Sequence, residues 1–170
     1  VKGLLIQKVT LGPKGAEKET DFTIGPMDKD SIFGQALLVN VDTKTTDVNI
    51  YYQTTEASGA LDWLDTTLTS SKTKPFLYTQ GQAILTRTWI PIQDSPSNRI
   101  TYSADVKVPN DLLALMSAKN PTKRNQTGRY HFEMTKAIPS YLIALAVGDI
   151  GFKDLGQHCG IYAEKELLQE

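Results

Sequence analysis

The feature that most limits the fold of this chain is a succession of short segments that alternate apolar with polar residues or are rich in β-branched and aromatic residues. Such segments are typical of strands rather than helices. Turn-forming pairs such as Gly12-Pro13, Gly25-Pro26 and Asn120-Pro121 lie between candidate strands, where they interrupt a helix or a ladder. The sequence therefore predicts an all-β fold, in a saddle-like or sandwich arrangement of mainly antiparallel strands.

One candidate strand, Ile100 to Val108, also predicts which side chains are buried, because alternate residues of a strand share a face. Its apolar face should meet the core, and the face with Ser103 and Asp105 should meet solvent. By contrast, Ala163 to Glu170 is charged and helix-like, so we expect a short helix to begin at the C-terminus. The other clear candidate strands are Leu4 to Thr10, Gln35 to Val41, Asp47 to Gln53, Ala83 to Trp89, Leu113 to Ala118, Gly128 to Thr135 and Tyr141 to Gly148.

Charge and composition exclude several classes of function. The 18 basic and 19 acidic residues leave a net charge of -1, so we expect no nucleic-acid partner. Cys159 is the only cysteine, which rules out an intrachain disulfide. The longest apolar stretch, Tyr141 to Val147, is far shorter than the roughly 20 residues of a membrane span, so no membrane partner is expected. These features fit a cytoplasmic or an exported protein equally well.

The residues needed for metal or nucleophilic catalysis do not occur in a usable pattern. His131 and His158 are the only histidines and lie far apart in the sequence, whereas zinc sites require closely spaced ligands. His158 adjoins Cys159, but neighbouring residues on an extended segment point to opposite faces, so they should not form a catalytic pair. We therefore predict no catalytic residue, no metal site and no bound cofactor in this chain.

The stretch from Pro75 to Pro96 reads PFLYTQGQAILTRTWIPIQDSP. Three motifs in this stretch resemble, in order and spacing, motifs in the amino-terminal domain of zinc aminopeptidases of the leukotriene A hydrolase type. They are Gln-Gly-Gln-Ala, Arg87 and Pro-Ile-Gln-Asp-Ser-Pro. The resemblance extends over Leu61 to Glu166, whereas the first 55 residues match loosely, as a series of strands. Ile92 stands where relatives have cysteine.

This resemblance implies a non-catalytic, saddle-like β domain packed on a thermolysin-like catalytic domain. Residues 1–163 would form the β domain, incomplete at its N-terminal end, and residues 164–170 would begin the connection to the missing catalytic domain. Zinc and the catalytic groups of the parent metallopeptidase would lie outside this chain. The fragment alone should then be inactive and bind no zinc.

The resemblance also implies that Gln80, Gly81 and Gln82 bind the substrate. A glutamine carbonyl can accept a hydrogen bond from the α-ammonium group of a peptide N-terminus, and glycine allows the close approach of backbone. Many aminopeptidase relatives have glutamate in place of Gln82, which places this chain nearer the leukotriene hydrolase branch. The alternative is that both glutamines merely cap a loop. For Arg87 and Asp94 we expect a structural ion pair.

A different class of function also fits the strand pattern. The chain could be a free-standing β-sandwich binding or interaction module without catalytic activity, with its ligand on the Pro75 to Pro96 loop.

Overall fold

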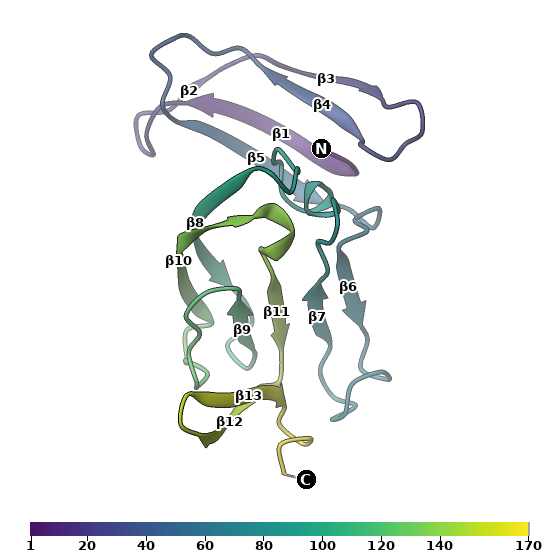
Figure 1. Cartoon of the computed structure of the whole chain (residues 1–170), viewed down its shortest axis with the longest axis vertical. Coiled ribbons are helices and arrows are strands. Elements are labelled where there is room, and N and C mark those ends of the chain that lie inside the picture. The colour runs from purple at the N-terminus through teal and green to yellow at the C-terminus, as the bar shows by residue number, and fades with distance from the viewer. Residues whose placement is uncertain (170) are drawn as a thin grey trace.

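A computed structural model describes residues 1–169 and consists almost entirely of short antiparallel strands (Figure 1). The first five form what we call the amino-terminal layer, residues 1–54. In it, β1 (Leu4–Leu11) pairs with β2 (Lys18–Glu19) on one side and with β5 (Val48–Thr54) on the other. β3 (Phe22–Met27) pairs separately with β4 (Gln35–Val39). These strands lie together at one end of the molecule.

The central region, residues 60–164, contains the remaining strands. Its four-stranded sheet has the order β6 (Leu61–Leu64), β7 (Phe76–Thr79), β11 (Leu145–Gly148) and β9 (Leu113–Met116). β8 (Arg99–Lys107) pairs with β10 (Arg129–Pro139), and β12 (Ile150–Gly156) forms a hairpin with β13 (Cys159–Glu164). Two short 3-10 helices, η1 (Thr86–Thr88) and η2 (Ser140–Leu142), connect these strands.

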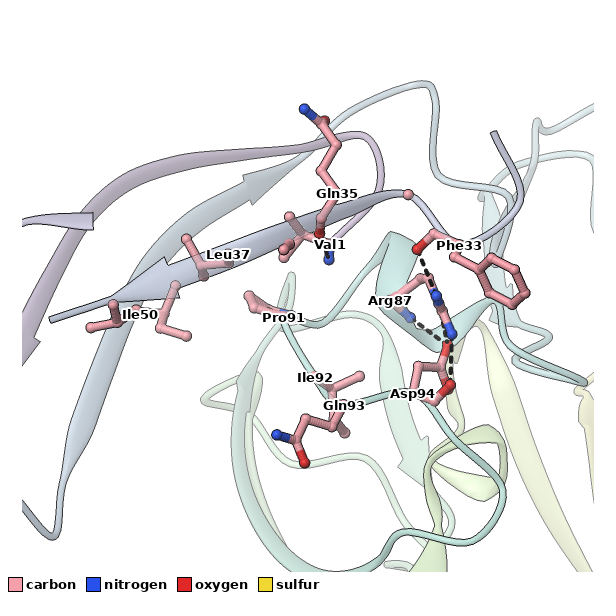
Figure 2. A pocket seen from close by; sticks show the side chains of 13 residues that line it. Val1, Phe33, Gln35, Leu37, Ile50, Arg87, Pro91, Ile92, Gln93 and Asp94 are labelled. Carbon is pink, nitrogen blue, oxygen red and sulfur yellow. Dashed lines mark hydrogen bonds and ion pairs between the residues drawn. The ribbon is translucent and has the colours of Figure 1, made fainter. Parts of the chain in front are cut away.

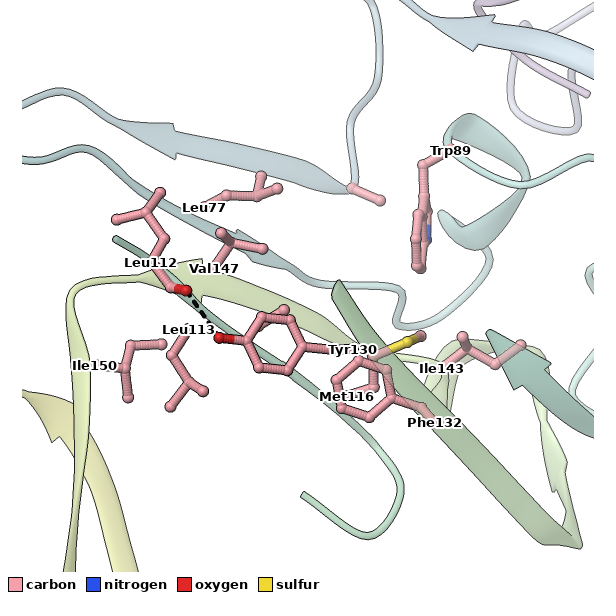
Figure 3. Packing of buried hydrophobic residues seen from close by; sticks show 12 residues of the cluster. Leu77, Trp89, Leu112, Leu113, Met116, Tyr130, Phe132, Ile143, Val147 and Ile150 are labelled. Atoms are coloured by element: carbon pink, nitrogen blue, oxygen red, sulfur yellow. Dashed lines mark hydrogen bonds between the residues drawn. The ribbon is translucent and has the colours of Figure 1, made fainter. Parts of the chain in front are cut away.

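One hydrophobic core holds the central region together. Its buried members come from all three sheets of this region and from the connections between them (Figure 3). Phe132 and Leu113 are almost fully buried, and burial of such side chains contributes about 1.5–3 kcal/mol each. The hydroxyl of Tyr130, buried among them, donates to the carbonyl of Leu112 at 3.0 Å. In the amino-terminal layer, the buried apolar side chains are Ile6 and Val9.

The predicted all-β class is confirmed, and so is the predicted face of β8. Tyr102, Ala104 and Val106 pack against the core, while Ser103 and Asp105 on the opposite face are exposed. Every strand pairing in the described residues is antiparallel. No helix in this part of the chain has the length and apolar character needed to cross a bilayer.

The predicted strand from Ala83 to Trp89 is wrong. This segment forms turns followed by η1, because its backbone groups bond to one another. The amide of Leu85 donates to the carbonyl of Gly81 at 2.9 Å, and the Leu85 carbonyl accepts from both the amide and the hydroxyl of Thr88. A ladder partner is therefore unnecessary, although the alternation of side chains resembles that of a strand.

The helix predicted to begin at the C-terminus is also wrong within the described residues. β13 continues to Glu164, and the chain then makes successive turns between Glu164 and Gln169. The Glu164 carboxylate accepts hydrogen bonds from the amide and hydroxyl of Ser70, which fixes this end of the strand. Glu170 lies outside the described residues. Gly25-Pro26, expected between strands, instead lies inside β3 at a shift in its register, where proline is tolerated.

Candidate functional site

The Gln80–Gly81–Gln82 loop begins directly at the end of β7. The amide of Gln80 donates to the carbonyl of Ala60 at 2.9 Å, and the hydroxyl of Thr79 accepts from the amide of Leu145 at 2.9 Å. These bonds join the start of the loop to the residue before β6 and to the first residue of β11, the two neighbours of β7. The loop is therefore held by the four-stranded sheet on two sides.

Gly81 is buried at the middle of this loop, and the space around it admits no side chain. A Cβ atom there would lie 2.7 Å from the hydroxyl oxygen of Thr86 and 3.0 Å from the carbonyl oxygen of Tyr141. Thr86 belongs to η1 and Tyr141 to η2. The two 3-10 helices thus meet the loop at one glycine, a convergence that sequence spacing does not reveal.

The two glutamines differ in what their side chains do. The carbonyl oxygen of the Gln80 side chain accepts a hydrogen bond from the amide of Gln82 at 3.0 Å. Gln80 thereby caps the loop. Both residues are exposed, but the side-chain amide of Gln82 has no hydrogen-bond partner within residues 1–169. The peptide bond between Gln82 and Ala83 is cis. Of the two, Gln82 presents the side chain that is available to a ligand.

Arg87 and Asp94 form the structural ion pair predicted for them (Figure 2). The Asp94 side chain has no exposure, and its Oδ2 accepts from the amide of Arg87 at 2.9 Å and from its Nε at 3.4 Å. The other guanidinium nitrogens donate to the carbonyl oxygens of Asp94 and Phe33, each at 2.6 Å. Arg87 therefore links the segment after the loop to the amino-terminal layer.

A groove of about 480 Å³ lies beside this ion pair, between the two parts of the molecule (Figure 2). One wall contains Leu37 and Ile50 from the amino-terminal layer, and the other contains Pro91 and Ile92. The residues of the Gln80–Gln82 loop do not line it. The groove and the loop are therefore distinct features.

The histidines and the cysteine are dispersed over the surface. His131 on β10 lies with its Nδ1 2.8 Å from an exposed carboxylate oxygen of Asp105 on β8. His158 and Cys159 lie at the exposed turn between β12 and β13. Residues 1–169 contain no group of three His, Cys, Asp or Glu side chains that could hold a metal ion. The described residues therefore do not fit a zinc site.

Comparison with known proteins gives a consistent set of relatives. The family described as the Peptidase M1 N-terminal domain matches residues 2–142. Aminopeptidase B from Mus musculus is 39% identical over 144 residues, which is 82% of this chain and 22% of that protein. Leukotriene A-4 hydrolase from Xenopus laevis is 39% identical over 141 residues, covering 80% of this chain and 22% of that protein. This chain thus spans less than a quarter of either relative's length.

Solved structures agree with the sequence relatives. Native leukotriene A4 hydrolase from Saccharomyces cerevisiae superimposes on 99% of this chain with a TM-score of 0.84 and 28% identity, and the match covers 25% of that chain. An M1 zinc metallopeptidase from Deinococcus radiodurans matches 95% of this chain and 37% of its own, with a TM-score of 0.64 and 19% identity. The second likeness, at that identity, shows the fold alone.

Proposed function

Because the chain belongs to the peptidase M1 N-terminal domain family, we propose that it is the non-catalytic amino-terminal domain of a zinc metallo-aminopeptidase. Zinc and the catalytic groups would lie in a separate domain of the same polypeptide, and the substrates would be peptides with a free N-terminus. This division of labour is supported by the absence of a metal-binding group in residues 1–169 and by the greater length of the relatives. Family membership favours this role over a free-standing binding module.

Within that role, the Gln80–Gly81–Gln82 loop would form part of the wall of the substrate cleft. The observation that carries this proposal is the contrast between a fixed backbone and an unoccupied side chain: Gly81 is buried and the backbone amide of Gln82 is bonded to Gln80, whereas the exposed side-chain amide of Gln82 has no partner among the described residues. A recognition group needs both properties, because a fixed backbone reduces the entropy lost on binding. Gln80 would contribute by holding the amide of Gln82.

The chemistry of Gln82 suits an α-ammonium group. Its side-chain carbonyl can accept a hydrogen bond from the positively charged amine, and a hydrogen bond to a charged group is stronger than one between neutral groups. A peptide whose amine is blocked would lose this bond. Gln82 would therefore help to register the first residue of a substrate and so favour removal of N-terminal residues.

The location of zinc can be tested on the gene. The complete reading frame should contain a His-Glu-x-x-His motif with a further glutamate downstream of Glu170, because those residue types supply zinc ligands and a general base. A stop codon directly after Glu170 would leave no place for the catalytic domain. The free-standing module would then be the better function.

The loop can be tested by kinetics of the full-length enzyme. Gln82→Ala should raise KM for an amino-acid amide substrate by roughly ten- to a hundredfold, the loss expected for one hydrogen bond of about 1.5–3 kcal/mol to a charged group. Zinc content, measured by metal analysis, should stay at the wild-type stoichiometry. Gln82→Glu should lower KM, because a carboxylate attracts the ammonium group more strongly. Kinetics that are unchanged in both variants would refute the role of Gln82.

A further inference from the structure

We propose that Asp94 is a positioning residue for the substrate loop, and that it acts by holding η1 and η2 against Gly81. The inference rests on the proposed function, since it assigns a second group to the same site. Asp94 itself is buried and twelve positions after Gln82, so it would touch no substrate. Its effect would pass through the two short helices that enclose the loop.

Both 3-10 helices contact Gly81. The position where its Cβ would stand lies 2.7 Å from the Thr86 hydroxyl oxygen, 3.0 Å from the Tyr141 carbonyl oxygen and 3.1 Å from the Tyr141 Cα. Gly81 is thus pressed between side chain on one flank and backbone on the other. A displacement of η1 or η2 would therefore displace Gly81, together with the glutamines on either side.

Asp94 bonds to the segments on both sides of Gly81. One carboxylate oxygen of Asp94 accepts the amide hydrogen of Arg87, which is the residue after Thr86. The other accepts the hydroxyl hydrogen of Ser140, which is the residue before Tyr141. One side chain therefore ties together the neighbours of both residues that enclose Gly81.

An aspartate suits position 94 better than a neutral residue does. Its two oxygens receive three donors, namely the Arg87 amide, the Arg87 Nε and the Ser140 hydroxyl. A carboxylate can accept all of them, because it has only acceptor sites and its charge balances the guanidinium. An asparagine in its place keeps the shape and one carbonyl oxygen. Its NH₂ group can only donate, so it could bond to the Ser140 hydroxyl only if that hydroxyl became the acceptor. A leucine keeps neither bond.

A purely structural role is the alternative, since Arg87 also bonds to Phe33 in the amino-terminal layer. The two roles predict different dependence on Gln82. If Asp94 and Ser140 act by placing the loop, their substitution should matter only while Gln82 can bind substrate. If they serve stability alone, their effects on kinetics should be independent of Gln82.

The test is a double-mutant cycle in the full-length enzyme, with an amino-acid amide as substrate. Ser140→Ala removes one tie to Asp94 at little cost in volume, and Asp94→Asn removes the charge. Each should raise KM about three- to tenfold with a smaller change in kcat. In the Gln82→Ala background the same substitutions should change KM less than twofold, because coupled residues show non-additive effects. Asp94→Leu should raise KM more than Asp94→Asn does, because leucine keeps neither hydrogen bond.

Tyr130→Phe provides a matched control. Like Ser140→Ala it removes a buried hydroxyl, here one that donates to the Leu112 carbonyl and accepts from the Asn125 amide, in the core but away from the loop. It should lower the unfolding midpoint about as much as Ser140→Ala while leaving KM unchanged.

The outcomes separate the two proposals. If Gln82→Ala raises KM, and Ser140→Ala raises KM by the same factor with and without Gln82, the positioning role of Asp94 is overturned. The substrate role of Gln82 then stands. Unchanged kinetics in Gln82→Ala would overturn both. Should Asp94→Asn fail to fold, the cycle with Ser140→Ala still decides, since it touches the same carboxylate.

Discussion

The amino-terminal layer and the central region are both built from antiparallel strands, but they are stabilised to different degrees. The main core cluster has twelve buried side chains, all of them in residues 60–150. In the layer, Ile6 and Val9 are the buried apolar residues, while Leu38 and Phe33 are exposed. Hydrophobic burial is the dominant favourable contribution to folding, so the central region supplies most of the stability.

The difference shows how the loop proposed to bind substrate can be exposed and yet held in place. Gln80 to Gln82 belong to the central region, where the loop bonds to the four-stranded sheet and Gly81 contacts both 3-10 helices. Contacts with the amino-terminal layer reach the site indirectly, through Arg87 and its bonds to Phe33 and Lys2. The layer should therefore tolerate change better than the central region, and Arg87 should be the point at which the two are coupled.

The largest effect should come from the core itself. Phe132→Ala should lower the free energy of unfolding by about 3–5 kcal/mol, because it leaves a cavity where a ring is almost fully buried. Leu38→Ala in the layer should change it by less than about 0.5 kcal/mol, since that side chain is 60% exposed. Urea denaturation of both variants measures the contrast. Equal losses would contradict the assignment of stability to the central region.

A substitution in the loop should lower the free energy of unfolding by a smaller amount. Gly81→Ala should destabilise the protein by roughly 1–3 kcal/mol, because the added methyl meets Thr86 and the backbone of Tyr141. Gly59→Ala is a matched control, since a Cβ there meets only Leu85 at an ordinary 3.6 Å. The unfolding midpoints of the two variants should differ accordingly. A tolerated Gly81→Ala would mean that the loop is not held as described.

The coupling between the regions should be sensitive to Arg87→Lys. Lysine keeps the charge but lacks the planar fork that reaches Asp94 and Phe33 together, so we expect a loss of about 1–2 kcal/mol. Hydrogen exchange should accelerate mainly in residues 1–54. Acceleration spread evenly over β8 and β10 would show that Arg87 does not join two separable parts.

The smallest change in stability should come from a substitution within the amino-terminal layer, and it should depend on pH. Hydrogen bonds from the hydroxyls of Tyr51 and Thr10 hold the pKa of Glu17 below its usual value. A depressed carboxylate pKa adds stability above the unfolded pKa, which is lost as pH falls through the folded value. Glu17→Gln should therefore be slightly less stable than the wild type at pH 7, and the difference should shrink as the pH falls through the pKa of the folded state. A difference in stability that did not change with falling pH would exclude this cause.

Much of the fold could be predicted from local patterns. Alternation gave the all-β class and the buried face of β8, because one side of that strand packs on the core. The pattern failed at Ala83 to Trp89, where Thr88 satisfies the Leu85 carbonyl locally, and at the C-terminus, where Ala163 and Glu164 pair with β12 and the residues after them make turns. In both places hydrogen bonding not visible in the pattern of residues decided the structure.

The site was predictable only as a set of residues. The resemblance singled out Gln80, Gly81 and Gln82 together, and their role in binding substrate stays a prediction. The structure separates the three: Gln80 caps the loop, Gly81 is enclosed and Gln82 remains exposed. That separation depends on Tyr141, which is distant in sequence and meets Gly81 only in the folded chain.

The most direct measurement of the role of Gln82 is the preference of the full-length enzyme for a free amine. It is obtained by comparing the inhibition constants of a peptide and of the same peptide with its amine acetylated, for the wild type and for Gln82→Ala. The wild type should prefer the free peptide, and Gln82→Ala should reduce that preference roughly ten- to a hundredfold by weakening mainly the binding of the free peptide. An unchanged preference would show that Gln82 does not bind the α-ammonium group.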